Sequence, residues 1–90
     1  MWSIYEKKTL VKAIKKIPIH IRKHYELWKK IAELEGPQGL KLIKGYQDEA
    51  LKGNWQGFRS CRLSKQWRII YKVTNEDFEI YVIDINPHKY

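Results

Sequence analysis

The C-terminal part of the chain, from Trp55 to Tyr90, is the feature that most constrains the fold. It contains three apolar runs of strand length, separated by short polar stretches at residues 64–66 and 74–77. Apolar runs divided by such turns are typical of antiparallel strands that follow one another across a sheet. The sequence therefore predicts a three-stranded antiparallel meander in this region.

The N-terminal part has a helical pattern instead. Two apolar stripes at helical spacing mark its helices: Leu10, Val11, Ile14 and Ile17, then Ile21, Tyr25, Trp28 and Ala32. Pro18 separates the two, and the second helix is predicted to end near Gly36-Pro37, because glycine suits a left-handed C-cap and proline cannot continue a helix. The predicted fold class is α+β, with an N-terminal helical hairpin packed on a small antiparallel β-sheet.

Two segments have more than one interpretation. Residues 2–5 alternate too briefly to be assigned, and an edge strand is one possibility. Leu40, Leu42 and Ile43 fit either a short strand or a last helical piece. The remaining sequence predicts a single domain over residues 1–90, whose size allows one modest core.

The net charge of +8 indicates an acidic partner. Residues 1–36 carry nine Lys/Arg and four acids, and residues 37–90 carry nine and six, so the excess is spread over the chain. An uncompensated positive field destabilises a small compact protein, and it is usually tolerated for the sake of a partner. Nucleic acid and an acidic protein are the candidates, and a solvated basic surface without a ligand is the alternative.

Cysteine, histidine and hydropathy favour a cytoplasmic protein without a metal. A lone Cys61 cannot form an internal disulfide, and no apolar run reaches the length of a membrane span. His20 and His24 lie one helical turn apart, as a metal pair would, but no third ligand of matching type is near in sequence. We interpret them as surface histidines and expect no metal and no cofactor.

The first turn of the meander predicts a phosphate site. If residues 64–66 form a three-residue hairpin loop, Arg62 lies directly opposite Arg68 on one face of the sheet. The other face, under the helices, then holds Cys61, Leu63, Trp67, Ile69, Tyr71 and Val73. Two facing guanidinium groups repel each other unless an anion lies between them, and a phosphate matches their fork geometry. A two-residue loop would place Arg68 opposite Leu63, and two arginines turned into solvent are the other alternative.

Asp48 and Glu49 precede the meander. These acids either offset nearby positive charge or present one carboxylate to a basic pocket. In the second case a neighbouring arginine would keep the carboxylate ionised and ready to accept a proton.

Several short segments together resemble the RelE/ParE superfamily of type II toxin–antitoxin toxins, and among them the mRNA-cleaving RelE, YoeB and HigB-like branch. They are Leu51-Lys52-Gly53, residues 57–63, residues 67–71, a hydrophobic last strand and His88-Lys89-Tyr90. The resemblance covers roughly residues 36–90. It implies two helices packed on a twisted antiparallel sheet, with the site of a ribosome-dependent endoribonuclease on the open side.

The resemblance also implies roles for individual residues. Arg68 matches the active-site arginine of the strand after the hairpin, and Arg62 matches a phosphate-contacting arginine before it. Glu49 matches the general base of YoeB-like members, and His88 matches their near-terminal general acid. Tyr90 stands where such toxins often carry a functional tyrosine. Around these five predicted catalytic residues we expect four RNA-binding residues: Lys52, Arg59, Lys65 and Lys72.

The expected partners are a cognate acidic antitoxin, which covers or distorts the site, and the ribosome with its mRNA. A homodimer or a toxin–antitoxin hetero-oligomer is possible, and no membrane is involved. Two other functions remain open from the sequence: a ParE-like inhibitor of DNA gyrase without catalysis, and a basic RNA-binding module. A near-terminal His88 together with Arg68 favours the nuclease, since an inhibitor that only binds needs no proton donor.

Overall fold

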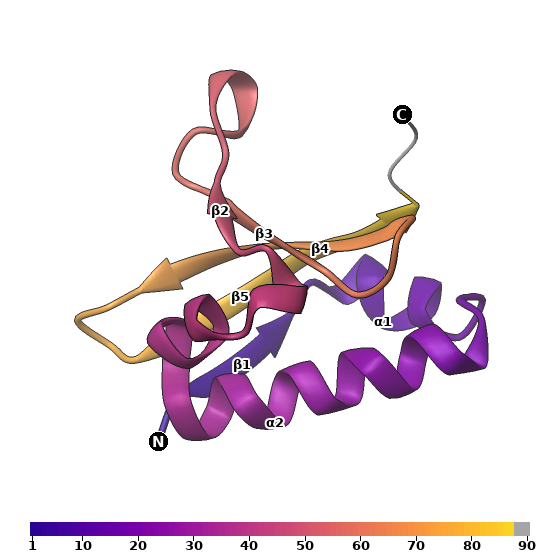
Figure 1. Cartoon of the computed structure of the whole chain (residues 1–90), viewed down its shortest axis with the longest axis horizontal. Helices are drawn as coiled ribbons and strands as arrows, with labels where there is room; N and C mark the ends of the chain where they lie inside the picture. Colours follow the sequence, from indigo (N-terminus) through magenta and orange to yellow (C-terminus); the bar gives the residue numbers. More distant parts are fainter. Residues whose placement is uncertain (88–90) are drawn as a thin grey trace.

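The computed structural model describes residues 1–87, in which two helices lie against a five-stranded sheet (Figure 1). In chain order the elements are β1 (Ser3–Glu6), α1 (Lys8–Ile14), α2 (Ile19–Leu42), β2 (Glu49–Ala50), β3 (Arg59–Arg62), β4 (Trp67–Thr74) and β5 (Glu79–Pro87). Short 3-10 turns occupy Lys44–Tyr46 and Gly53–Trp55. Both helices lie on one side of the sheet, and we call the opposite side the open face (Figure 1). The predicted fold class is confirmed.

The sheet is mixed, with strand order β1-β5-β4-β3-β2. The strands β3, β4 and β5 form the predicted antiparallel meander, and β2 extends it at one edge. At the other edge β1 pairs in parallel with β5, so the possible N-terminal edge strand does form. The Tyr25 hydroxyl donates a 2.6 Å hydrogen bond to Glu6, which ties the end of β1 to α2.

The core lies between α2 and the helix-facing side of the meander. The predicted stripe of Ile21, Tyr25, Trp28 and Ala32 is buried, and it packs with Cys61, Leu63, Ile69 and Tyr71. The predicted inner face of the sheet is therefore confirmed, with Trp67 and Val73 packed at its margin. Trp28 and Tyr71 meet edge to face with ring centroids 5.3 Å apart, which joins helix to sheet at the centre of the core.

The first helical piece of α2 ends at Gly36-Pro37, as the sequence predicts, and a second helical piece follows it directly. The regular geometry of α2 breaks at Gly36, which has φ 68° and ψ −166°, and the second piece continues from residue 37 to residue 42. The indole of Trp2 occupies the place of a side chain at Gly36, since a Cβ there would lie 2.3 Å from Trp2 Nε1. Pro37 is tolerated because it stands in the first turn after the break. Leu40 and Leu42 accordingly belong to a helix and not to a strand.

No helix within residues 1–87 is both long enough and apolar enough to cross a membrane.

Candidate active site

The hairpin between β3 and β4 has the register that places two arginines side by side. Arg62 pairs with Arg68, and Cys61 pairs with Ile69, as the three-residue loop predicts. Ser64 closes this loop, because its hydroxyl accepts hydrogen bonds from the backbone N–H groups of Gln66 and Trp67 at 3.3 and 3.1 Å. His24 on α2 adds a 2.8 Å hydrogen bond from its Nδ1 to the carbonyl of Leu63, which fixes the loop on the helix side. The predicted juxtaposition of Arg62 and Arg68 is therefore confirmed.

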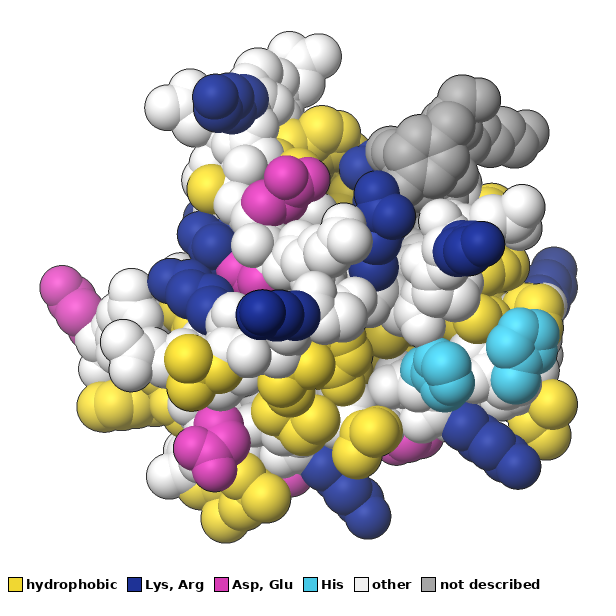
Figure 2. Space-filling view, in the orientation of Figure 1, with side chains coloured by type: hydrophobic (Ala, Val, Ile, Leu, Met, Phe, Trp, Pro, Cys, Tyr) yellow, Lys and Arg dark blue, Asp and Glu magenta, His cyan; other side chains and the backbone are white. Residues whose placement is uncertain are grey.

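A pocket of about 60 Å³ opens at this hairpin. Four predicted site residues line it: Glu49, Arg62, Lys65 and Arg68. The other lining residues are Gln47, Ser60, Ser64, Gln66 and Trp67. Three cations and one carboxylate give the pocket an excess positive charge, which suits an anionic group. In the space-filling view, Lys and Arg side chains gather on the open face at the base of the β2–β3 connection (Figure 2).

Strand alternation explains how Glu49 reaches this pocket. Glu49 pairs with Ser60, and Ala50 pairs with Arg59. Side chains two residues apart on a strand share a face, so Ser60 lies on the same face as Arg62, and Glu49 and Arg68 join them through pairing. Asp48, the residue before Glu49, is on the opposite face.

Asp48 is the centre of a buried polar cluster behind the pocket. Its side chain is 1% exposed, and Oδ1 accepts hydrogen bonds from Arg59 Nε and Nη2 at 2.9 and 2.5 Å. Oδ2 accepts from the Cys61 thiol at 3.2 Å and from the Tyr71 hydroxyl. One carboxylate thus joins β3 and β4 to the chain just ahead of β2. We call Asp48, Arg59, Cys61 and Tyr71 the Asp48 cluster.

The pKa values of the three donors in the cluster, Arg59, Cys61 and Tyr71, are raised, so these groups stay protonated. Burial raises the pKa of the Cys61 thiol, and the nearby Asp48 adds to this effect. Burial also raises the pKa of Tyr71, together with the neighbouring Cys61 and Asp48. Burial lowers the pKa of the Arg59 guanidinium, but its hydrogen bonds and charge interaction with Asp48 outweigh this and raise it. Both Cys61 and Tyr71 therefore remain hydrogen-bond donors to Asp48, and Arg59 remains a cation.

The structure separates the four predicted RNA-binding residues. Lys65 lies in the pocket, whereas Lys52 and Lys72 are exposed outside it. Arg59 points to the other face of the sheet, where its guanidinium is bound to Asp48. RNA binding by all four stays a prediction. His88 and Tyr90 lie outside the described residues.

The sequence did not predict which of the two acids is buried and which lines the pocket. It identified both acids and expected one beside an arginine, and Asp48 is the one that pairs. The available signal was the alternation of faces, which requires residues 49–50 to be recognised as a strand. Two residues are too few for a strand pattern to emerge from sequence.

Among residues 1–87, no group of three or more His, Cys, Asp or Glu side chains is placed to hold a metal ion.

Sequence comparison finds a family and a characterised relative. The model of the family described as "Bacterial toxin of type II toxin-antitoxin system, YafQ" matches residues 3–90. The mRNA interferase toxin YafQ of Escherichia coli is 38% identical over 37 residues, which are 41% of this chain and 40% of that protein. The alignment thus spans about two fifths of the length of the curated relative.

Structural comparison finds the same fold in several solved toxins. A chain of the archaeal RelE–RelB complex of Pyrococcus horikoshii superposes with a TM-score of 0.77 at 24% identity, over 96% of this chain and 93% of that chain. A chain of the YoeB–YefM complex of Staphylococcus aureus gives 0.74 at 21% identity, over 99% of both chains. YafQ of Escherichia coli gives 0.70 at 22% identity, over 97% of this chain and 93% of that chain. Because the family model matches nearly the whole sequence, this protein belongs to the YafQ family of bacterial toxins of type II toxin–antitoxin systems.

Proposed function

We propose that this toxin is a ribosome-dependent endoribonuclease that cleaves mRNA in the pocket between β2 and the β3–β4 hairpin. The observation that carries the proposal is the meeting of Glu49, Arg62, Lys65 and Arg68 in one pocket. A carboxylate beside several cations is suited to the transfer of a phosphoryl group with removal of a proton. The name of the Escherichia coli relative, an mRNA interferase toxin, supports the same activity.

The proposed reaction is attack by the neighbouring 2′-hydroxyl on the phosphodiester. Glu49 accepts the proton of the 2′-OH as the new bond from O2′ to phosphorus forms. Arg62 and Arg68 stabilise the charge that develops on the phosphate oxygens, and the bond from phosphorus to O5′ breaks. The products are a 2′,3′-cyclic phosphate and a 5′-hydroxyl. His88 is proposed as the donor of the proton to O5′, a role that rests on sequence resemblance alone.

Arg68 has a feature that supports its role in this reaction. Its Nε is buried and has no hydrogen-bond partner among residues 1–87. A buried donor without a partner is costly, so such groups are uncommon in folded proteins. Arg22 Nε and Trp28 Nε1 are buried in the same way, so this feature supports the role only together with the position of Arg68 in the pocket, where its guanidinium group would donate to a phosphate oxygen.

The proposed partners follow from the activity and from the charge. A cognate acidic antitoxin would complement the net charge of +8 and inhibit cleavage by covering the pocket. The solved RelE–RelB and YoeB–YefM complexes each pair a protein of this fold with a second protein. Because its substrate would be mRNA on the ribosome, we propose that the toxin acts in the cytoplasm.

The first prediction is that the protein creates new mRNA ends on translating ribosomes. Purified protein is added to a translation reaction, and the 5′ ends of the mRNA are mapped. A matched mRNA with one 2′-deoxynucleotide at the mapped position should remain intact there, because the attacking hydroxyl is missing. Absence of new ends in the unmodified mRNA, or equal cutting of the 2′-deoxy substrate, would contradict the proposed reaction.

The second prediction separates electrostatic binding from chemistry. Five exposed lysines lie on and around α1: Lys7, Lys8, Lys12, Lys15 and Lys16. Replacing them with glutamine should weaken association with ribosomes and reduce its salt dependence, since phosphate contacts release counterions. The cleavage rate at saturating protein should stay close to that of the parent, because the helices lie on the side opposite the pocket (Figure 1). A slower rate at saturation would place α1 in the active site.

A further inference from the structure

The connection between β2 and β3, residues 51–58, stands off the open face of the sheet as an arm (Figure 1). We call it the β2–β3 arm. Backbone hydrogen bonds within it give it a defined shape: Leu51 N–H donates to the carbonyl of Phe58 at 2.9 Å, and Phe58 N–H donates to that of Trp55 at 3.0 Å. Gly53 and Gly57 supply the positive φ angles of 66° and 95° that the arm requires.

Trp55 on this arm contributes nothing to the hydrophobic core. Its side chain lies outside the core cluster, and the residue is 39% exposed. It meets Phe58 edge to face, with ring centroids 5.5 Å apart and an interplanar angle of 89°. An edge-to-face contact uses the edge of one ring and one face of the other, so at least one face of Trp55 remains for another flat group.

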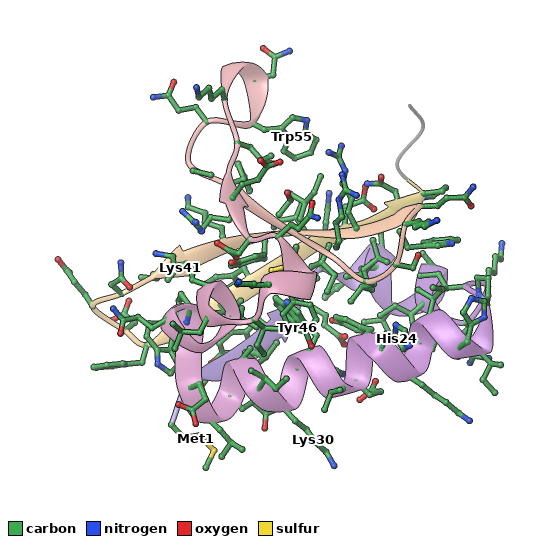
Figure 3. All side chains as sticks on the ribbon, in the orientation of Figure 1. Met1, His24, Lys30, Lys41, Tyr46 and Trp55 are labelled. Atoms are coloured by element: carbon green, nitrogen blue, oxygen red, sulfur yellow. The ribbon has the colours of Figure 1, made fainter. Side chains whose placement is uncertain are left out.

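The part of the arm that carries Trp55 is basic, and the arm joins the sheet beside the pocket. Lys52 is exposed at the base of the arm, and Lys72 Nζ lies 5.9 Å above the ring of Phe58. The two ends of the arm join the chain beside Glu49 and Ser60, which line the pocket. Trp55 points from the arm toward the end of the sheet where β4 begins and β5 ends (Figure 3).

We propose that Trp55 is a stacking platform for one nucleobase of the mRNA, next to the phosphodiester that occupies the pocket. Base stacking on aromatic side chains, with lysines on the adjacent phosphates, is a general way to hold a single RNA strand. Tryptophan is also common at protein interfaces, so the test below separates a bound RNA base from a protein partner on the arm. The inference rests on the proposed nuclease function and adds a substrate-binding residue to it.

The test uses programmed ribosomes whose mRNA carries one 2′-deoxynucleotide at the cleavage position, so that the bound mRNA stays uncut. Trp55→Ala should bind these ribosomes about 10-fold more weakly than the parent, the effect expected for the loss of one stacked base. Trp55→Phe should remain within about threefold, because it keeps an aromatic face, whereas Trp55→Leu keeps apolar bulk and should resemble alanine. Phe78→Ala is the matched control: it removes an exposed aromatic ring from the β4–β5 turn, at the opposite end of β4, and should not change binding.

An abasic scan of the mRNA identifies the base concerned. Removing the base at one position beside the cleavage site should weaken binding of the parent and have no further effect on Trp55→Ala.

If the parent cleaves mRNA but Trp55→Ala binds as the parent does at every position, the stacking platform is wrong and the nuclease stands. If Trp55→Ala loses only its affinity for the antitoxin, Trp55 belongs to a protein interface and the proposal is overturned. If the parent produces no new mRNA ends, the nuclease proposal itself fails.

Discussion

Replacing Arg68 with alanine should slow single-turnover cleavage of ribosome-bound mRNA by about 10²–10³-fold, the scale expected for the loss of one preorganised donor in a transition state. Arg68 lies opposite Arg62 in the pocket, and its Nε is buried without a partner among residues 1–87. The charge that it would balance grows as the 2′-oxygen attacks, so the loss should reduce the rate of the chemical step more than it weakens binding.

Arg68→Lys distinguishes charge from geometry. Lysine keeps a positive charge but not the planar fork that can donate two parallel hydrogen bonds to a phosphate, so it should recover only part of the rate. Lys41→Ala is the matched control, because it removes one exposed positive charge at the far end of α2 and should leave the rate unchanged. Melting temperatures measured in parallel separate lost chemistry from unfolding. If folded Arg68→Ala cuts mRNA at the parent rate, the pocket is not the nuclease site.

The register of the β3–β4 hairpin was predictable because it depends on local information. A three-residue loop of polar residues fixes which residues face each other, and the pairing of Arg62 with Arg68 follows from it. The buried face of the sheet was predictable for the same reason, since side chains alternate along a strand and Cys61, Ile69 and Tyr71 all lie on one side.

Features that depend on distant contacts were not predictable in the same way. The parallel pairing of β1 with β5 joins residues 3–6 to residues 79–82, and four residues carry too little pattern to identify the partner strand. The helical piece after Gly36 forms beside the indole of Trp2, which lies more than thirty residues away along the chain. Local signals at Gly36-Pro37 predicted the break, whereas the pattern of Leu40, Leu42 and Ile43 did not decide between a helical continuation and a short strand.

At the candidate site, the position of Asp48 also depends on distant contacts and not on local sequence. Its sequence position next to Glu49 gives no reason to assign the two carboxylates to different faces, because β2 has only two residues. Tertiary contacts decide the matter: three donors from β3 and β4 converge on Asp48, whereas Glu49 lies in the open pocket. The buried acid is therefore a structural group and the accessible acid is the candidate base.

Replacing Asp48 with alanine should lower the free energy of unfolding by about 3 kcal/mol, near the lower end of the cost of breaking a buried charge pair. The loss of Asp48 affects its partners Arg59 and Tyr71 to different extents. Arg59 is 25% exposed, so its guanidinium can turn toward water once Asp48 is gone. The Tyr71 hydroxyl cannot, because Tyr71 is 0% exposed, and it would lose its charged acceptor. For a chain of this length the change corresponds to a fall of about 12–24 °C in the melting temperature.

Tyr71→Phe and Asp77→Ala complete this experiment. Tyr71→Phe removes one donor and leaves Asp48 bound to Arg59 and Cys61, so it should cost about 1–2 kcal/mol. The double variant Asp48→Ala/Tyr71→Phe should be more stable than the sum of the two single losses implies, because it has no orphaned hydroxyl.

Asp77→Ala is the control for loss of an acid: Asp77 is exposed in the β4–β5 turn, and its replacement should change stability by less than about 0.5 kcal/mol. Urea denaturation of the four variants gives these free energies. If Asp48→Ala is as stable as Asp77→Ala, the Asp48 cluster does not hold β2 in place, and the position of Glu49 must have another cause.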